Sequence, residues 1–235
     1  MDIYNYIFLI HLVFDLLKFY IVLYVMDKIV LKIFIIKEAR YYFLHFLFNL
    51  WVIWNTFEDT FDVFSMYSWD GDMDSKTCSY VLLIIMIFHF HHALYSSKSL
   101  SKSDWIHHTI SAGFVPIAVI TLYTNQKAVN CSNFFMIGLP GCCDYFLLFL
   151  TKYGIINKIT EKRLNCFLNL SLRLPGNFYA GVVALSYELT QPHPIMILCI
   201  ICLSSLTHHI NATYYSDLVV GSYYRHRTIV AGKQT

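Results

Sequence analysis

Histidine side chains occur in pairs and runs within the apolar stretches of this chain, where an imidazole could act as a general base, an acyl acceptor or a metal ligand. The pairs are His107-His108 and His208-His209, and the run is His89-Phe90-His91-His92. Membrane di-iron enzymes are known by several histidine boxes with a two- or three-residue gap before a histidine pair, and this sequence lacks them. We therefore expect no metal site and no cofactor.

Four other polar residues, Lys18, Asn49, Asp144 and Arg173, also lie inside apolar stretches. A charge placed there costs about 2.5–3.5 kcal/mol on insertion scales, so such residues usually face the interior of a helix bundle or a wet cavity. Each lies seven to nine residues from the same side of the expected membrane. At 1.5 Å per residue this is about 11–14 Å. Their common depth predicts a polar cavity that opens toward that side.

We expect this cavity to bind substrate through five side chains: Arg173, Asn49, Lys18, His208 and His209. Asp144 and Arg173 are expected to interact across two neighbouring helices. The alternative is that Asp144 with Arg173, and Asp15 with Lys18, are structural ion pairs without a functional role.

The composition requires a membrane protein. The chain has 235 residues, of which 57% are hydrophobic, 17% aromatic and 14% charged, against about 45–50% apolar and about 25% charged in soluble domains. A chain this apolar with a net charge of +2 is not disordered. The 17 basic residues are nearly balanced by 15 acidic ones, so we expect no binding to nucleic acid.

A membrane-spanning helix needs about 20 mostly apolar residues. The expected spans are Tyr4–Met26, Tyr41–Phe57, Ser79–Tyr95, Trp105–Thr124, Ser132–Thr151, Leu164–Tyr187 and Ile195–Val219. The short segment Ile29–Ile36 is expected to lie at the membrane surface. The fold class is therefore an all-α bundle of about seven transmembrane helices. Residues 1–36 form the first helix and the interfacial segment, residues 37–225 the main transmembrane domain, and residues 226–235 a short cytosolic tail.

The orientation follows from the basic residues in the loops, which favour the cytosolic side. Of the Lys and Arg residues in the expected loops, Lys76 and Lys127 fall on one side of the membrane, and all the others fall on the opposite side. With seven spans, this asymmetry predicts a lumenal N-terminus and a cytosolic C-terminus. The glycosylation acceptor pattern Asn130-Cys131-Ser132 then falls in a lumenal loop.

Four ordered motifs resemble the TLC-domain family, which contains the ceramide synthases, the translocating-chain-associating membrane protein and several regulators of membrane lipids. They are Asp104-Trp105-Ile106-His107-His108-Thr109, Cys143-Asp144-Tyr145-Phe146-Leu147-Leu148, Arg173-Leu174-Pro175, and Asn211 followed by Tyr214-Tyr215. The resemblance covers roughly residues 37–225 and implies a TLC-like helical membrane fold in the endoplasmic reticulum.

Ceramide synthases carry a His-Asp pair three residues before the second aspartate, and here Pro140 and Gly141 stand in that place. The chain is therefore closer to the non-synthase members, which implies a protein that binds, moves or regulates membrane lipids. The alternative is a lipid N-acyltransferase with acyl-CoA as co-substrate, in which His107, His108 and Asp144 are catalytic. The expected partner is a membrane lipid, such as a sphingoid or acyl lipid, and the sequence leaves room for a homo-oligomer.

Overall fold

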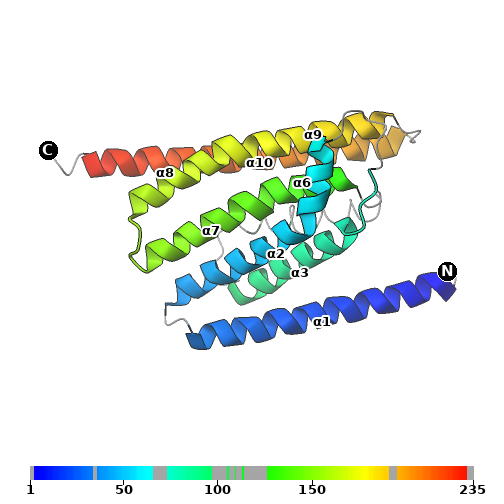
Figure 1. The fold of residues 1–235 in the computed structure, drawn as a ribbon, viewed down its shortest axis with the longest axis horizontal. Coiled ribbons are helices and arrows are strands. Elements are labelled where there is room, and N and C mark those ends of the chain that lie inside the picture. The colour runs from blue at the N-terminus through cyan, green and yellow to red at the C-terminus, as the bar shows by residue number, and fades with distance from the viewer. Residues whose placement is uncertain are drawn as a thin grey trace. The chain divides into compact units, whose positions relative to one another are not determined.

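The computed structural model describes residues 3–33, 36–65, 73–96, 105, 109, 113, 126–190 and 195–231. Its helices are α1 (Ile3–Ile33), α2 (Lys37–Ser65), α3 (Cys78–Ser96), α6 (Lys127–Asn133), α7 (Leu139–Lys152), α8 (Lys158–Leu168), α9 (Leu174–Leu189) and α10 (Ile195–Ala231). Two π-helical turns, η2 (Phe134–Gly138) and η3 (Asn169–Arg173), join α6 to α7 and α8 to α9. Figure 1 shows these elements along the chain.

The expected all-α class is confirmed for these residues, in which extended backbone pairs only at the bridge between Asp74 and Gln126. Within the same residues one continuous helix, Lys127–Lys152, is long and apolar enough to cross a membrane, and the apolar helix Cys78–Ala93 is shorter. The bundle of seven spans therefore stays a prediction. His107 and His108 lie outside the described residues.

One expectation about local structure is wrong. The segment Ile29–Ile36 is not a separate surface segment, because α1 continues through it to Ile33. At the other end of the chain, α10 runs past the expected span end at Val219 to Ala231. In both places the basic residues that suggested a boundary are compatible with helix, since Lys and Arg are good helix formers.

The chain divides into two compact units. The first contains α1 and nearly all of α3. Its helix α1 buries Leu23, Asp27 and Val30, which are spaced four and three residues apart and so share a helical face. The ring of Tyr20 meets the ring of His91 edge-on, with the centroids 5.7 Å apart.

The second unit contains α2 and the helices from α6 to α10. Helix α2 packs along α6, η2 and α7; α9 packs on α6; and α10 packs on α8 and α9. The chain reverses its direction between α7 and α8 and again between α9 and α10, so these neighbouring helices are antiparallel (Figure 1).

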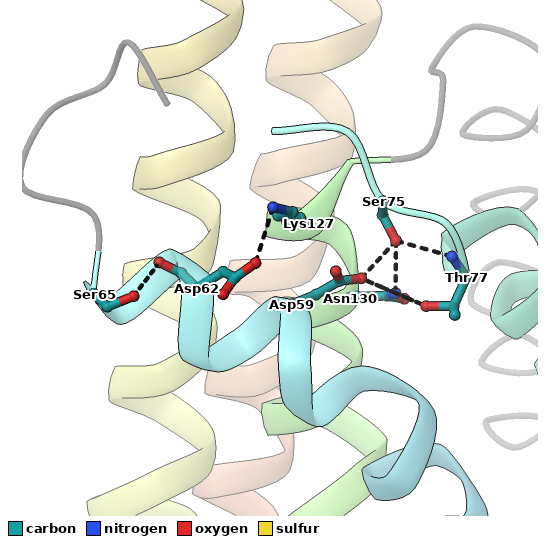
Figure 2. Close-up of polar contacts among 7 residues, drawn as sticks. All are labelled: Asp59, Asp62, Ser65, Ser75, Thr77, Lys127 and Asn130. Atoms are coloured by element: carbon teal, nitrogen blue, oxygen red, sulfur yellow. Dashed lines mark hydrogen bonds and ion pairs between the residues drawn. The ribbon is translucent and has the colours of Figure 1, made fainter. Parts of the chain in front are cut away.

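A polar cluster joins α2, the segment before α3, and α6 at one end of this unit (Figure 2). Oδ2 of the buried Asp59 accepts hydrogen bonds from Ser75 Oγ at 2.5 Å and from Asn130 Nδ2 at 2.6 Å. Asn130 also donates to Thr77 Oγ1 at 2.8 Å. Ser75 Oγ accepts from the main-chain N–H of Cys78 at 3.1 Å and so caps the start of α3. The cluster fixes three chain segments that are far apart in sequence.

The position of Asn130 corrects the loop expected from the sequence. Asn130 lies inside α6 and is fully buried. Its amide nitrogen is occupied by Asp59 and Thr77. In the folded chain this acceptor pattern is therefore not accessible for glycosylation.

The two π turns stand at equivalent places before a Leu-Pro-Gly sequence. η2 precedes Leu139-Pro140-Gly141, and η3 precedes Leu174-Pro175-Gly176. A proline inside a helix has no N–H to donate, and its ring collides with the carbonyl four residues earlier. A π turn, with its i to i+5 bonds, changes which carbonyl lies opposite the ring. This allows both helices to continue past the proline.

The glycine after each proline lets a neighbouring side chain lie against the helix backbone. A Cβ at Gly176 would stand 2.2 Å from Cγ of Phe135, and a Cβ at Gly141 would stand 2.8 Å from Nδ2 of Asn49. At Gly176 an added Cβ would collide with the Phe135 ring and its Cβ, so the close approach of α9 to η2 requires glycine there. At Gly141 it would meet the end of the Asn49 side chain, which would have to shift.

Substitution of Gly176 tests this packing. We expect Gly176→Ala to lower the free energy of unfolding by about 1–3 kcal/mol, because the new methyl group displaces the Phe135 ring. Gly221→Ala is the matched control, since nothing lies within 4 Å of a Cβ there, and it should stabilise α10 by about 0.5–1 kcal/mol. Thermal unfolding in detergent compares the two, and equal melting temperatures would contradict the packing.

Candidate functional site

A line of polar side chains follows one face of the helix formed by α8, η3 and α9. Its members are four residues apart and all buried: Glu161, Asn165, Asn169, Arg173 and Asn177. Asn169 and Asn177 are completely inaccessible, and Arg173 is 8% exposed. We call these five residues the polar stripe. It contains Arg173, which the sequence predicts to bind substrate.

The π turn η3 keeps the polar stripe on one side of its helix. In an α-helix four residues rotate by about 400°, so a four-residue repeat drifts by about 40° at each step. The wider turn between Asn169 and Arg173 rotates less per residue and reverses part of this drift. Without it, Asn165 and Asn177 would point in clearly different directions.

A chain of hydrogen bonds connects Arg173 to Asp144. Arg173 Nη1 donates to Asn169 Oδ1 at 2.6 Å, and Asn169 Nδ2 donates to Asn165 Oδ1 at 2.7 Å. Asn165 Nδ2 then donates to Asp144 Oδ1 on α7 at 2.5 Å. The two amides are aligned so that each accepts from the Arg173 side and donates toward Asp144.

This chain changes the expected pair of Asp144 and Arg173. The two side chains are brought to the same region, but their charges are connected through Asn169 and Asn165 instead of a direct ion pair. The reason is geometric. Asp144 lies beside Asn165, two helical turns before Arg173, and the side chains of Asn165 and Asn169 fill the space between the two charges.

The guanidinium of Arg173 keeps donor capacity beyond this chain. Its carbon lies 6.0 Å from the centroid of the Tyr215 ring on α10, which is a cation–π contact. Its Nε is buried and has no hydrogen-bond partner within the described structure. A guanidinium has five N–H donors, so this one is able to bind an anionic group.

Aromatic residues surround the Asp144 end of the chain. Tyr145, next to Asp144, has its ring centroid 4.5 Å from that of His45 and 6.0 Å from that of Tyr41, both on α2. His45 Nδ1 contacts the main-chain oxygen of Tyr41 at 2.9 Å. The site thus combines one cation, two carboxylates and a histidine among tyrosines.

Of the other expected substrate residues, two lie in the second unit. Asn49 is buried against Gly141, one turn before Asp144. His209 on α10 packs edge-on against Phe178, with the ring centroids 5.1 Å apart, and lines a shallow hollow with Ile210, Thr213 and Tyr214. The side chain of His208 lies outside the described residues.

The expected position of Lys18 is wrong. Lys18 and Asp15 belong to the first unit and are exposed, with 74% and 56% of their side chains accessible. Lys18 Nζ lies 3.1 Å from Asp15 Oδ1. Their three-residue spacing lets the two charges pair with each other on the helix surface. The pair therefore needs no partner on a neighbouring helix. Lys18 is not part of the polar stripe.

Four residues of the stripe were not predicted from the sequence: Glu161 and the three asparagines Asn165, Asn169 and Asn177. Neutral amides carry no charge, so a search for ionisable residues in apolar segments passes over them. Their regular spacing of four residues with Glu161 and Arg173 was the available signal. Among the described residues, no group of three or more potential metal ligands is found.

Comparisons with family models, with curated proteins and with solved structures give no match for this chain.

The hydrogen-bond chain is tested by removing its central amide. Asn169→Ala deprives both Arg173 and Asn165 of a buried partner, and we expect it to cost about 1–3 kcal/mol of unfolding free energy. Ser171→Ala, on the exposed side of the same π turn, is the control and should have little effect. In a double-mutant cycle with Asp144→Asn, a coupling of about 0.5–3 kcal/mol is expected. Strictly additive effects would contradict the chain.

Glu161, at the N-terminal end of the stripe, predicts a dependence on pH. Burial raises the pKa of the Glu161 carboxyl above its ordinary 4.5, against the opposing effects of Lys162 and a hydrogen bond with Asn165. For a raised pKa, the contribution to stability is full below the unfolded value and is lost as pH rises through the folded value. The protein should therefore lose stability as pH rises above about 4.5, and Glu161→Gln should reduce this loss. Unfolding curves at a series of pH values measure it, and an unchanged profile for Glu161→Gln would be inconsistent with the prediction.

Proposed function

We propose that this chain is a membrane-embedded helical protein that binds, moves or regulates membrane lipids through the polar stripe and Asp144. In this proposal the N-terminus is lumenal, the C-terminus is cytosolic, and the membrane is that of the endoplasmic reticulum. The fold is a TLC-like bundle of about seven spans, able to assemble as a homo-oligomer.

The observation that carries the proposal is an inverted distribution of polarity on α8, η3 and α9. The buried face holds the polar stripe, whereas the opposite face exposes Phe167 (66%), Leu170 (50%) and Phe178 (60%). A helix in a water-soluble protein buries its apolar face and exposes its polar one. The reverse arrangement suits a helix whose outer face contacts lipid and whose polar face lines the interior.

Other helices of the second unit expose similar apolar lines. On α2 these are Trp54, Phe57, Phe61 and Phe64, and on α10 they are Leu203, Leu206, Ile210, Tyr214 and Leu218. The spacing of three and four residues places each set on one helical face. Soluble monomers rarely expose apolar surface on this scale, so these faces support the proposed bilayer.

The link to lipids comes from Arg173. A buried guanidinium with an unpartnered Nε, held in place by Asn169 and beside Tyr215, suits the phosphate or carboxylate of a lipid headgroup. The resemblance of several motifs to TLC-domain regulators of membrane lipids supports the same proposal. Acyl transfer from acyl-CoA is the alternative outcome; it depends on His107 and His108, and the described residues provide no observation in its favour.

The proposal is tested in two steps with the full chain. Membranes from expressing cells are first washed with alkaline carbonate, and the protein should stay in the pellet. A glycosylatable tag after Thr235 should remain unmodified, because the proposed C-terminus is cytosolic. Recovery of the chain in the supernatant would overturn the membrane proposal, and a glycosylated tag would overturn the orientation.

The second step identifies the lipid. Purified wild type, Arg173→Gln and the control Ser171→Ala are compared by mass spectrometry of bound lipids. We expect one anionic lipid class to be retained by wild type and Ser171→Ala and to be lost from Arg173→Gln. An identical lipid content in all three would contradict the proposal. Transfer of an acyl group from acyl-CoA to a sphingoid base by wild type, and not by His108→Ala, would establish the enzymatic alternative instead.

A further inference from the structure

We propose that a second, separate lipid site lies on the outer surface of the α8–α10 pair, where Arg163 and Arg227 bind the headgroup of an anionic phospholipid in the cytosolic leaflet. This inference rests on the proposed membrane embedding, but it does not involve Arg173 or the polar stripe.

The level of the membrane boundary is set by one contact between the two helices. Lys162 Nζ on α8 donates to Ser222 Oγ on α10 at 2.5 Å. The sequence places the cytosolic ends of the two spans at Leu164 and Val219, two and three residues beyond this contact. Because the helices are antiparallel, both ends lie at nearly the same height. Two independent span boundaries thus agree on where the headgroups begin.

The same contact decides which side chains share a flank of the helix pair. Lys162 and Ser222 face each other, and each following residue is rotated by about 100°. Because the two helices are antiparallel, this rotation of about 100° places Arg163 on α8 and Tyr223 on α10 on the same flank of the helix pair. Arg227, one turn beyond Tyr223, lies on that flank as well. Arg163 and Arg227 are both exposed.

The charge at this end of the unit is strongly positive. Lys152, Lys158, Arg163, Arg225 and Arg227 are exposed. Two carboxylates lie on the same helix segments: Glu161 is 4% exposed and turned inward, and Asp217 lies two turns from Arg225 toward the membrane. Neither Arg163 nor Arg227 forms an ion pair within the described part of the chain. Both guanidinium groups are therefore available to a headgroup.

An apolar line continues from Arg163 toward the membrane centre. Phe167 and Leu170 follow Arg163 by four and seven residues, which places the three on one face, and both are at least half exposed. At 1.5 Å per residue they lie about 6 Å and about 10 Å deeper than Arg163. A cation at headgroup depth above an exposed apolar line matches the shape of a phospholipid, with its phosphate at the surface and its acyl chains below. A soluble phosphate ion would contact the arginine end of this site and leave the apolar line of Phe167 and Leu170 unused.

The test measures which lipids remain bound to the full chain. The protein is purified in detergent with equal amounts of phosphatidylserine and phosphatidylcholine of the same acyl chains, and the bound pool is quantified by mass spectrometry. Wild type should be enriched in phosphatidylserine. Each Lys or Arg near an anionic surface contributes about 1 kcal/mol, or about fivefold in binding. Arg163→Gln and Arg227→Gln should each reduce the enrichment about fivefold, and the double variant should reduce it further.

Three control variants distinguish this site from nonspecific charge attraction and from the core site. Lys76→Gln removes the same charge from an exposed loop on the side expected to be lumenal and should keep the enrichment. Arg163→Lys keeps the positive charge and should retain most of the phosphatidylserine enrichment. In the Arg173→Gln background, which lacks the core site, Arg163→Gln and Arg227→Gln should still reduce the enrichment, so the second site and the core site can fail independently. No enrichment in wild type, or an equal loss in Lys76→Gln, would overturn the proposal, whatever the carbonate wash shows about membrane embedding.

Discussion

The burial of one positive charge governs the second unit. Moving a guanidinium out of water costs several kcal/mol unless hydrogen bonds and an opposite charge compensate. Arg173 meets this requirement with Asn169, Asn165 and finally Asp144 on a different helix. Since each partner must lie within hydrogen-bond distance of the next, α7 and α8 have little freedom to slide past each other. The position of the charge therefore fixes the register of the surrounding helices.

The π turn η3 and the glycine at 176 serve the same end. A regular α-helix would have rotated Asn177 away from the line that begins at Glu161. Proline at 175 disfavours a regular α-helix at this point, and the wide turn that results keeps the polar residues in line. Gly176 then allows Phe135 to lie directly against the backbone. Local irregularity and close packing are thus two consequences of the same short sequence, Arg173-Leu174-Pro175-Gly176.

Much of the secondary structure could be predicted from hydropathy, because long apolar segments have few alternatives to helix. The ends were less predictable: Ile29–Ile33 and the residues after Val219 stay helical although basic residues occur there. At the site, charge identified Asp144 and Arg173, but a search based on charge could not find the neutral asparagines that connect them. Lys18 was misplaced for the opposite reason, since three-residue spacing to Asp15 is compatible with an exposed pair as well as a buried one. Asn130 was misplaced because a short polar stretch resembles a loop until its tertiary partner, Asp59, is known.

The engagement of Asn130 with Asp59 also makes folding and glycosylation mutually exclusive at this residue. In the proposed orientation Asn130 emerges on the lumenal side, where oligosaccharide transfer and folding compete for the same amide nitrogen. Asp59 and Thr77 are synthesised before Asn130, so both are already present when α6 appears. Whichever process reaches the nitrogen first excludes the other, because an amide carrying a sugar no longer fits into a completely buried position. The glycan state of this residue would then be a permanent record of how quickly α6 docked.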